Sequence, residues 1–195
     1  MVKKEKKGKI LSWGLCNCIL DWLETHPGDY LEIGCYHGIF LSEVAEKFSD
    51  IKVYSIDPHI ADGWTGEEKG TFLSEIKVNF KHNIEGLNNV THWELKTEEC
   101  LEKKYYNNIS DISCVLIDGS HHYEDILTDI KFISHLNNKQ DLMVVFDDIK
   151  ISDVIKSMEY FSEYFSHRIT KRYIAESNNI NKNPNYAYFI LSPQS

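Results

Sequence analysis

Hydrophobic and polar positions along the chain form two alternating patterns, which together indicate an α/β fold. Short apolar runs rich in β-branched and aromatic residues predict strands at 29–33, 52–56, 90–95, 112–117 and 142–147. Apolar residues at helical spacing predict helices near 38–48, 70–86, 97–103, 123–136 and 152–165. Strands that alternate with helices in this way predict a parallel sheet that is covered by helices on both faces.

The two ends of the chain depart from this alternation. An apolar stripe at helical spacing predicts a leading helix over 10–24, and the turn residues 26–28 should end it. Near the other end, the β-rich runs 168–175 and 186–191 are separated by SNNINKNPN, so they should form a hairpin. The chain has 195 residues, which favours a single domain over residues 10–195.

Charge and composition restrict the classes of partner. The chain carries 21 basic and 30 acidic residues, a net charge of −9, which opposes binding to a nucleic-acid backbone. The one basic cluster lies in residues 1–9, which we expect to be a flexible, solvated tail with Lys3, Lys4, Lys6, Lys7 and Lys9. No apolar stretch is long enough for a bilayer, and the charged start lacks a signal-peptide core. The chain has five cysteines, an odd number, which fits a reducing compartment. Together these features favour a cytoplasmic protein without membrane or nucleic-acid partners.

The segment YLEIGCYHG, residues 30–38, has the features of a nucleotide-cofactor site. An apolar run ends in Glu32, Gly34 and Gly38 flank a tight turn, and a helical stretch follows. Glycines at this place let backbone N–H groups approach a ligand at a helix N-terminus. The next apolar run ends in Asp57, and an acid at the tip of the second strand of a βαβ unit can accept hydrogen bonds from both ribose hydroxyls.

The spacing of the glycines distinguishes between cofactors. The dinucleotide pattern G-x-G-x-x-G requires a glycine where this chain has Tyr36, which argues against NAD and FAD. The pattern E-x-G-x-x-x-G with a distal Asp instead resembles motifs I and II of the class I S-adenosylmethionine-dependent methyltransferases. The resemblance implies a Rossmann-like, three-layer α/β/α fold with seven strands in the order 3-2-1-4-5-7-6, the last strand antiparallel. It also implies cofactor contacts by Glu32, Gly34, Cys35, Tyr36, Gly38, Asp57, Pro58, Thr97, Glu98 and Asp118.

Acidic residues follow two further strands. Asp118 stands at the tip of the fourth strand, and Asp147 and Asp148 stand at the tip of the fifth. Strand tips of an open α/β sheet meet at one crevice, where three carboxylates repel one another unless a cation lies between them. Oxygen ligands favour a hard divalent ion such as Mg²⁺. The alternative is that Asp147 or Asp148 caps the next helix and that Asp118 begins a turn.

The pair of segments IDGSHHYED and VVFDDI makes the resemblance more specific. It is similar to macrocin-type sugar O-methyltransferases and, more distantly, to catechol-type O-methyltransferases, which use a divalent ion. This resemblance implies that Asp118, Asp147 and Asp148 hold the metal, and it gives Asp118 and His121 catalytic roles. His121 stands where catechol-type relatives carry a lysine base, and imidazole, with an ordinary pKa of about 6.5, can accept a hydroxyl proton. Alternatively, this histidine is simply exposed or bonded to a carboxylate.

The expected activity is methyl transfer from S-adenosylmethionine to a hydroxyl of a small molecule, such as a sugar, a phenol or a natural-product intermediate. A non-catalytic module that binds the cofactor is the main alternative. A methyltransferase acting on protein or nucleic acid is a further one. A nucleic-acid N-methyltransferase should carry an N/D-P-P-Y/F motif after the fourth strand, where this chain has IDGSHHY. The sequence specifies neither the acceptor nor the oligomeric state.

Overall fold

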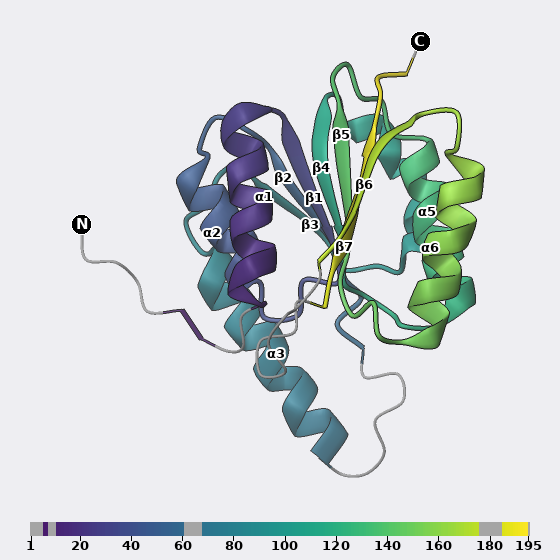
Figure 1. The fold of residues 1–195 in the computed structure, drawn as a ribbon. Helices are drawn as coiled ribbons and strands as arrows, with labels where there is room; N and C mark the ends of the chain where they lie inside the picture. Colours follow the sequence, from purple (N-terminus) through teal and green to yellow (C-terminus); the bar gives the residue numbers. More distant parts are fainter. Residues whose placement is uncertain (1–5, 8–10, 61–67, 176–184, 195) are drawn as a thin grey trace.

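A seven-stranded sheet flanked by helices forms the centre of the computed structural model, which describes residues 6–7, 11–60, 68–175 and 185–194 (Figure 1). The strands are β1 (Asp29–Ile33), β2 (Val53–Ile56), β3 (Val90–Trp93), β4 (Ile112–Ile117), β5 (Leu142–Phe146), β6 (Ile169–Ile174) and β7 (Ala187–Leu191). The helices are α1 (Trp13–Thr25), α2 (Ile39–Lys47), α3 (Glu68–Ile84), α4 (Thr97–Glu102), α5 (Tyr123–Ser134) and α6 (Ser152–Tyr164), with a short 3-10 helix, η1 (Tyr105–Asn108). All strands and α-helices expected from the sequence are present, whereas η1 was not predicted.

The strands lie in the order β3-β2-β1-β4-β5-β7-β6, which confirms the expected topology. Strands β1 to β5 pair in parallel, whereas β7 runs antiparallel to both β5 and β6. Every residue of β1, β2, β4 and β5 is buried, as expected for strands that are covered on both faces. Because these four strands are parallel, their carboxyl ends lie at the same end of the sheet. The antiparallel strand β7 begins at that end.

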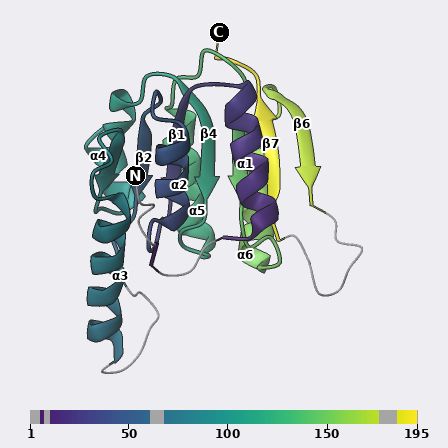
Figure 2. The same cartoon turned by 90° about the vertical axis from the view of Figure 1, so that its left-hand side faces the viewer.

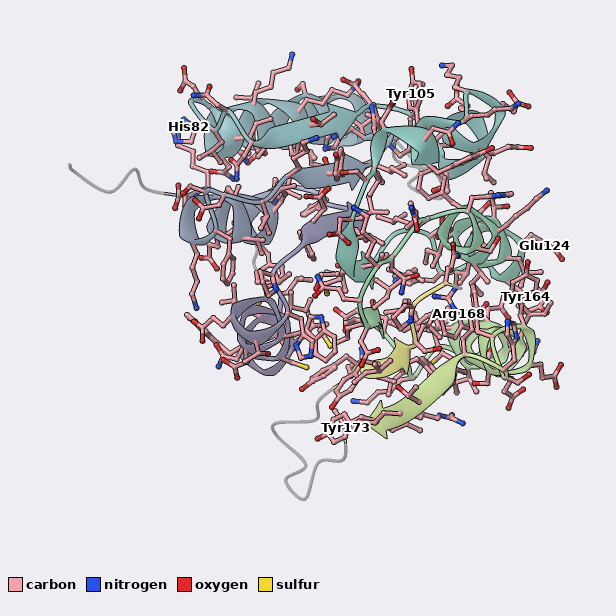
Figure 3. All side chains as sticks on the ribbon, turned by 90° about the horizontal axis from the view of Figure 1, so that it is seen from above. His82, Tyr105, Glu124, Tyr164, Arg168 and Tyr173 are labelled. Atoms are coloured by element: carbon pink, nitrogen blue, oxygen red, sulfur yellow. The ribbon has the colours of Figure 1, made fainter. Side chains whose placement is uncertain are left out.

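Helices cover both faces of the sheet. Helices α1 and α2 cross in front of the strands in Figure 2, and α5 and α6 lie behind them. Seen from above, α3, with His82, lies beside one edge of the sheet and Tyr173 of β6 marks the other (Figure 3). Apolar residues form one buried cluster on each face, with Leu15 and Leu41 in the first and Phe132 and Phe161 in the second.

Part of the basic segment that precedes α1 is ordered against the domain. The Lys6 ammonium donates to Ser42 Oγ at 2.6 Å and pairs with Glu46 at 2.7 Å. Asn83 exchanges two hydrogen bonds with the backbone of Lys7. Lys3, Lys4 and Lys9 lie outside the described residues. Within the described parts of the chain, no helix has the length and apolar character needed to cross a membrane.

Candidate functional site

A cavity of about 880 Å³ opens at the carboxyl ends of β1, β2 and β4. Its volume falls in the range of pockets that hold cofactors and drug-sized ligands. Seven of the ten cofactor residues predicted from the sequence line it: Gly34, Tyr36, Asp57, Pro58, Thr97, Glu98 and Asp118. The other three, Glu32, Cys35 and Gly38, do not line the cavity, and each belongs to the same strand and turn as the lining residues.

The glycine turn after β1 packs directly against the end of β4. Gly34 has a φ of +87°, and a Cβ atom there would lie 2.3 Å from the carbonyl oxygen of Asp118 and 2.4 Å from the Cα atom of Gly119. At Gly38, where φ is +66°, a Cβ atom would lie 2.6 Å from the ring of Phe80. Only glycine meets both conditions, a left-handed backbone and such a close approach. Gly34 therefore lets the β1 turn pack against the β4 turn, and Gly38 lets it pack against α3.

Replacing Gly34 by alanine should lower the free energy of unfolding by about 2–6 kcal/mol, because the strained backbone and the overpacking each cost about 1–3 kcal/mol. Gly86→Ala is the matched control, because Gly86 also has a positive φ, +85°, but has no atom within 4 Å of an added Cβ. It should therefore show the backbone cost alone. Urea unfolding measures both variants, and an equal loss of stability in the two would contradict the close packing against Asp118.

Asp57 is fixed by the backbone of two loops. Its Oδ2 accepts a hydrogen bond from the backbone N–H of Tyr36 at 2.8 Å, and its Oδ1 accepts one from the N–H of His59 at 2.7 Å. The carboxylate also lines the cavity. Each carboxylate oxygen can accept a second hydrogen bond, so the group is held in place and can still accept hydrogen bonds from ligand hydroxyls.

Glu32 is a buried carboxyl group behind the wall of the cavity. Its side chain is 3% exposed and accepts a hydrogen bond from the Tyr30 hydroxyl at 2.9 Å. Burial raises the pKa of Glu32 to about 8, and the negative charge of Asp57 acts in the same direction. Near neutral pH the protonated form is therefore favoured, because an ionised carboxylate at this place would lack sufficient solvation.

The raised pKa of Glu32 makes stability depend on pH. The folded protein keeps the proton up to about pH 8, whereas an unfolded glutamate loses it at its ordinary value of 4.5. Between these two values the folded state binds more protons, so stability should fall as the pH rises. Glu32→Gln should flatten this decline and become more stable relative to wild type above pH 8. Unfolding measured from pH 5 to pH 9 tests this, and equal slopes in both proteins would refute it.

A second group of polar residues forms where β4 and β5 end. Asp118, His121 and Asp148 each place a potential ligand atom within 4.8 Å of the others. His121 Nε2 lies 3.0 Å from Asp148 Oδ2. Asp118 and His121 also line the cavity. Two carboxylates and one imidazole form a suitable donor set for a divalent ion.

Asn185, just before β7, holds Asp148 in this group, which the sequence did not predict. The Asn185 amide donates to Asp148 Oδ1, while its own carbonyl groups accept from the backbone N–H groups of Ile149, at 3.1 Å, and Lys150, at 3.2 Å. Asp148 has a left-handed backbone, with φ of +52°. The only signal in the sequence was the position of Asn185 in a segment of turn-forming residues.

Asp147 is the predicted metal ligand that does not join this group in the described structure. Its charge reaches Cys16 on α1 as well as Asp118, and it raises the pKa of both groups. Burial raises the pKa of Asp147 itself to about 6. Burial and the charges of Asp147, Glu32 and Asp148 raise the pKa of Asp118 well above its ordinary range. The carboxyl groups thus repel one another, and a cation between them would relieve that repulsion.

The opposite wall of the cavity contains Thr97 and Glu98, at the start of α4, and Asp129 of α5. Asp129 is 4% exposed, and its carboxyl group bonds to the side chain of Thr97. Burial raises the pKa of Asp129 to about 7. The sequence analysis missed Asp129, although a single acid among the apolar residues on the buried face of a predicted helix was a visible signal.

Comparisons with known proteins agree with this architecture. A family model described as "Methyltransferase domain" matches residues 31–149. No curated protein matches the sequence. The O-methyltransferase TomG from Streptomyces achromogenes, solved in complex with SAM, is 14% identical, with a TM-score of 0.68 over 95% of this chain and 82% of that one.

Two further solved structures have the same fold. A putative O-methyltransferase from Klebsiella pneumoniae is 11% identical, with a TM-score of 0.66 over 97% of this chain and 84% of that one. An O-methyltransferase from Bacillus cereus, solved in complex with SAH, is 10% identical, with a TM-score of 0.64 over 94% of this chain and 83% of that one.

Proposed function

This chain belongs to the methyltransferase-domain family, and from that premise we propose that it transfers the methyl group of S-adenosylmethionine to a hydroxyl of a small molecule. One observation carries the proposal. The cavity that contains the fixed carboxylate of Asp57 is also lined by Asp118 and His121, two members of the group that could activate an acceptor. A cofactor site and a site for proton removal therefore share one space.

In this proposal the cofactor extends along the cavity from the glycine turn to the opposite wall. The methionine part lies at Gly34 and Asp118, the ribose hydroxyls bond to Asp57, and the adenine lies at Thr97 and Glu98. Helix α2 begins directly after the turn, so its N-terminal N–H groups favour the carboxylate of the methionine part. Glu32, Cys35 and Gly38, which the sequence also predicted to contact the cofactor, belong to the strand and turn that carry Gly34 and Tyr36.

The chemistry requires positioning more than activation of the methyl group, because the sulfonium has already activated it. The walls must align the acceptor oxygen in line with the methyl group and exclude water. We assign His121 the role of removing the hydroxyl proton. Its contact with Asp148, at 3.0 Å, fixes the orientation of the imidazole.

The residues present fit a divalent ion. Asp118 and Asp148 would provide oxygen ligands, and His121 lies close enough to bind the ion or to act beside it. Asp147, expected as a third ligand, stands next to Asp148, but its oxygens fall outside this group in the described structure. When bound, such an ion would supply a positive charge that lowers the pKa of the acceptor hydroxyl.

Turnover is the direct test of the proposed activity. The protein should release S-adenosylhomocysteine and form a methylated product with at least one member of a panel of sugars, phenols and catechols, detected by mass spectrometry. A net charge of −9 argues for small acceptors over nucleic acid. Tight cofactor binding with no turnover across the panel would instead favour a non-catalytic module that binds the cofactor.

A further inference from the structure

A second cluster of potential metal ligands lies at the β2–β3 side of the sheet. His59 follows β2, His92 belongs to β3, and Glu94 comes directly after β3. Each of these side chains places a potential ligand atom within 4.8 Å of the others. His92 and Glu94 are two residues apart along an extended segment, so both point to the same face. The cluster shares no residue with the Asp118–His121–Asp148 group, although His59 lines the same cavity, and the proposed reaction assigns no role to its side chains.

His92 has an unexplained buried nitrogen. Its Nδ1 lies 2.8 Å from Ser55 Oγ, whereas its buried Nε2 has no hydrogen-bond partner among the residues that the structure describes. Buried polar atoms in folded proteins are nearly always partnered, so such an atom calls for an explanation. Burial lowers the pKa of His92 to about 4, which keeps the ring neutral at pH 7. If Nδ1 carries the hydrogen and donates it to Ser55, Nε2 presents a lone pair, as a metal ligand requires.

A hydrogen bond to the backbone leaves one ring nitrogen of His59 available to an ion. Its Nε2 lies 3.0 Å from the carbonyl oxygen of Tyr36, which can only accept, so Nε2 carries the hydrogen and Nδ1 keeps the lone pair. The rings of His59 and His92 have centroids 5.0 Å apart. Two imidazoles that share one tetrahedral ion at about 2.0–2.1 Å have centroids roughly 5 Å apart, so the observed separation already suits an ion.

Glu94 supplies an anionic oxygen next to solvent. Its side chain is 46% exposed and its Oε1 pairs with the Lys77 ammonium. The hydrogen bond from Lys77 lowers the pKa of Glu94, which keeps the group ionised. A carboxylate has two oxygens, so Glu94 can bind an ion through the second one, or release Lys77, because an exposed ion pair contributes little to stability.

A competing cluster that shares His59 is less suitable. Cys35 and Asp57 also place ligand atoms within 4.8 Å of His59. However, burial raises the pKa of the Cys35 thiol well above its ordinary value, whereas only the thiolate binds metals well. Asp57 lines the cavity and is the group we assign to the ribose hydroxyls, so an ion on it would compete with the cofactor.

We propose that His59, His92 and Glu94 bind a transition-metal ion such as Zn²⁺, with water as the fourth ligand. Two imidazoles and a carboxylate select Zn²⁺ or a similar ion over Mg²⁺. A bound ion would connect the loop after β2 to β3. That loop contains Asp57 and Pro58, so the ion would stiffen one wall of the cavity.

The test uses the metal-free full-length protein in an Asp148→Asn background, which weakens the other candidate site. Calorimetry with Zn²⁺, and visible absorption with Co²⁺ as a probe, should show one site per chain. His92→Gln and Glu94→Gln should each weaken Zn²⁺ affinity by about 100-fold or more, beyond the 10–100-fold typical of residues outside the ligand set. His167→Gln, an exposed histidine elsewhere, and Cys35→Ser should leave it unchanged.

Glu94→Gln distinguishes a lost ligand from a folding defect. Glu94 is exposed, so this variant should keep the thermal unfolding midpoint of the metal-free parent protein. Unchanged Zn²⁺ affinity in both His92→Gln and Glu94→Gln would overturn the proposal. So would a lack of any Zn²⁺ or Co²⁺ signal at millimolar metal, or a loss of binding in Cys35→Ser alone.

Discussion

Removal of divalent ions should abolish methyl transfer while leaving much of the cofactor binding intact. Asp118, Asp147 and Asp148 crowd negative charge at the ends of β4 and β5, and the pKa of Asp118 and that of Asp147 are both raised. An ion held by these residues would offset this repulsion and would lower the pKa of the acceptor hydroxyl. Activity should therefore disappear in excess chelator and return when Mg²⁺ is added.

Asp148→Asn should have the same effect as chelation, because it removes a ligand that Asn185 holds in place. Asp50→Asn, at an exposed acid far from the cavity, is the matched control and should keep full activity. Glu94→Gln should still be rescued by Mg²⁺, which separates this prediction from the proposed Zn²⁺ site. Full activity in excess chelator would show that Asp118, Asp147 and Asp148 serve only as turn and helix-capping residues.

His121→Ala should lower the rate of transfer by about 10²–10⁴-fold, the usual contribution of a general base. The affinity for the cofactor should change by no more than a few-fold, since the assigned role concerns only the acceptor proton. In the wild type the rate should rise with pH through the range where imidazole loses its proton, because only neutral imidazole can accept one. That rise should be absent in the variant.

The matched control for His121 is His167→Gln, which changes an exposed histidine after α6. It should keep both the rate and the pH profile. Assays need an authentic acceptor, so that the chemical step limits the rate. If His121→Ala also kept the wild-type rate and pH profile, the divalent ion would activate the hydroxyl without His121. The contact of His121 with Asp148 would then be structural.

The fold could be predicted closely because its signals are local. Strands such as β4 are buried on both faces, so they are continuous apolar runs bounded by turn residues. The strand order could not be predicted from local signals, because no local pattern specifies which strands pair. It followed from the resemblance of the segments around Gly34, Asp57 and Asp118 to a known family. The helix η1 was missed because four residues are too few to show a period.

The site was predicted in outline, since parallel strands bring their tips together. The direction of individual side chains was not predicted. Adjacent residues at a strand end tend to face opposite sides, and of this pair only Asp148, which has a left-handed backbone, joins Asp118 and His121 in the described structure. Asn185 and Asp129 approach the site only through tertiary packing. No pattern in the sequence marks His92, and only the structure shows that its Nε2 has no partner among the described residues and that its ring lies beside His59.

Calorimetric titration with S-adenosylhomocysteine tests the central claim most directly, because it measures binding to the cavity without requiring the acceptor. The wild type should bind one molecule per chain. Asp57→Ala should lose about 1.5–3 kcal/mol of binding free energy, as expected for hydrogen bonds to a charged group, while Asp50→Ala binds as the wild type does. Wild-type protein that ignores millimolar S-adenosylhomocysteine, or a correctly folded Asp57→Ala variant with undiminished affinity, would contradict the account.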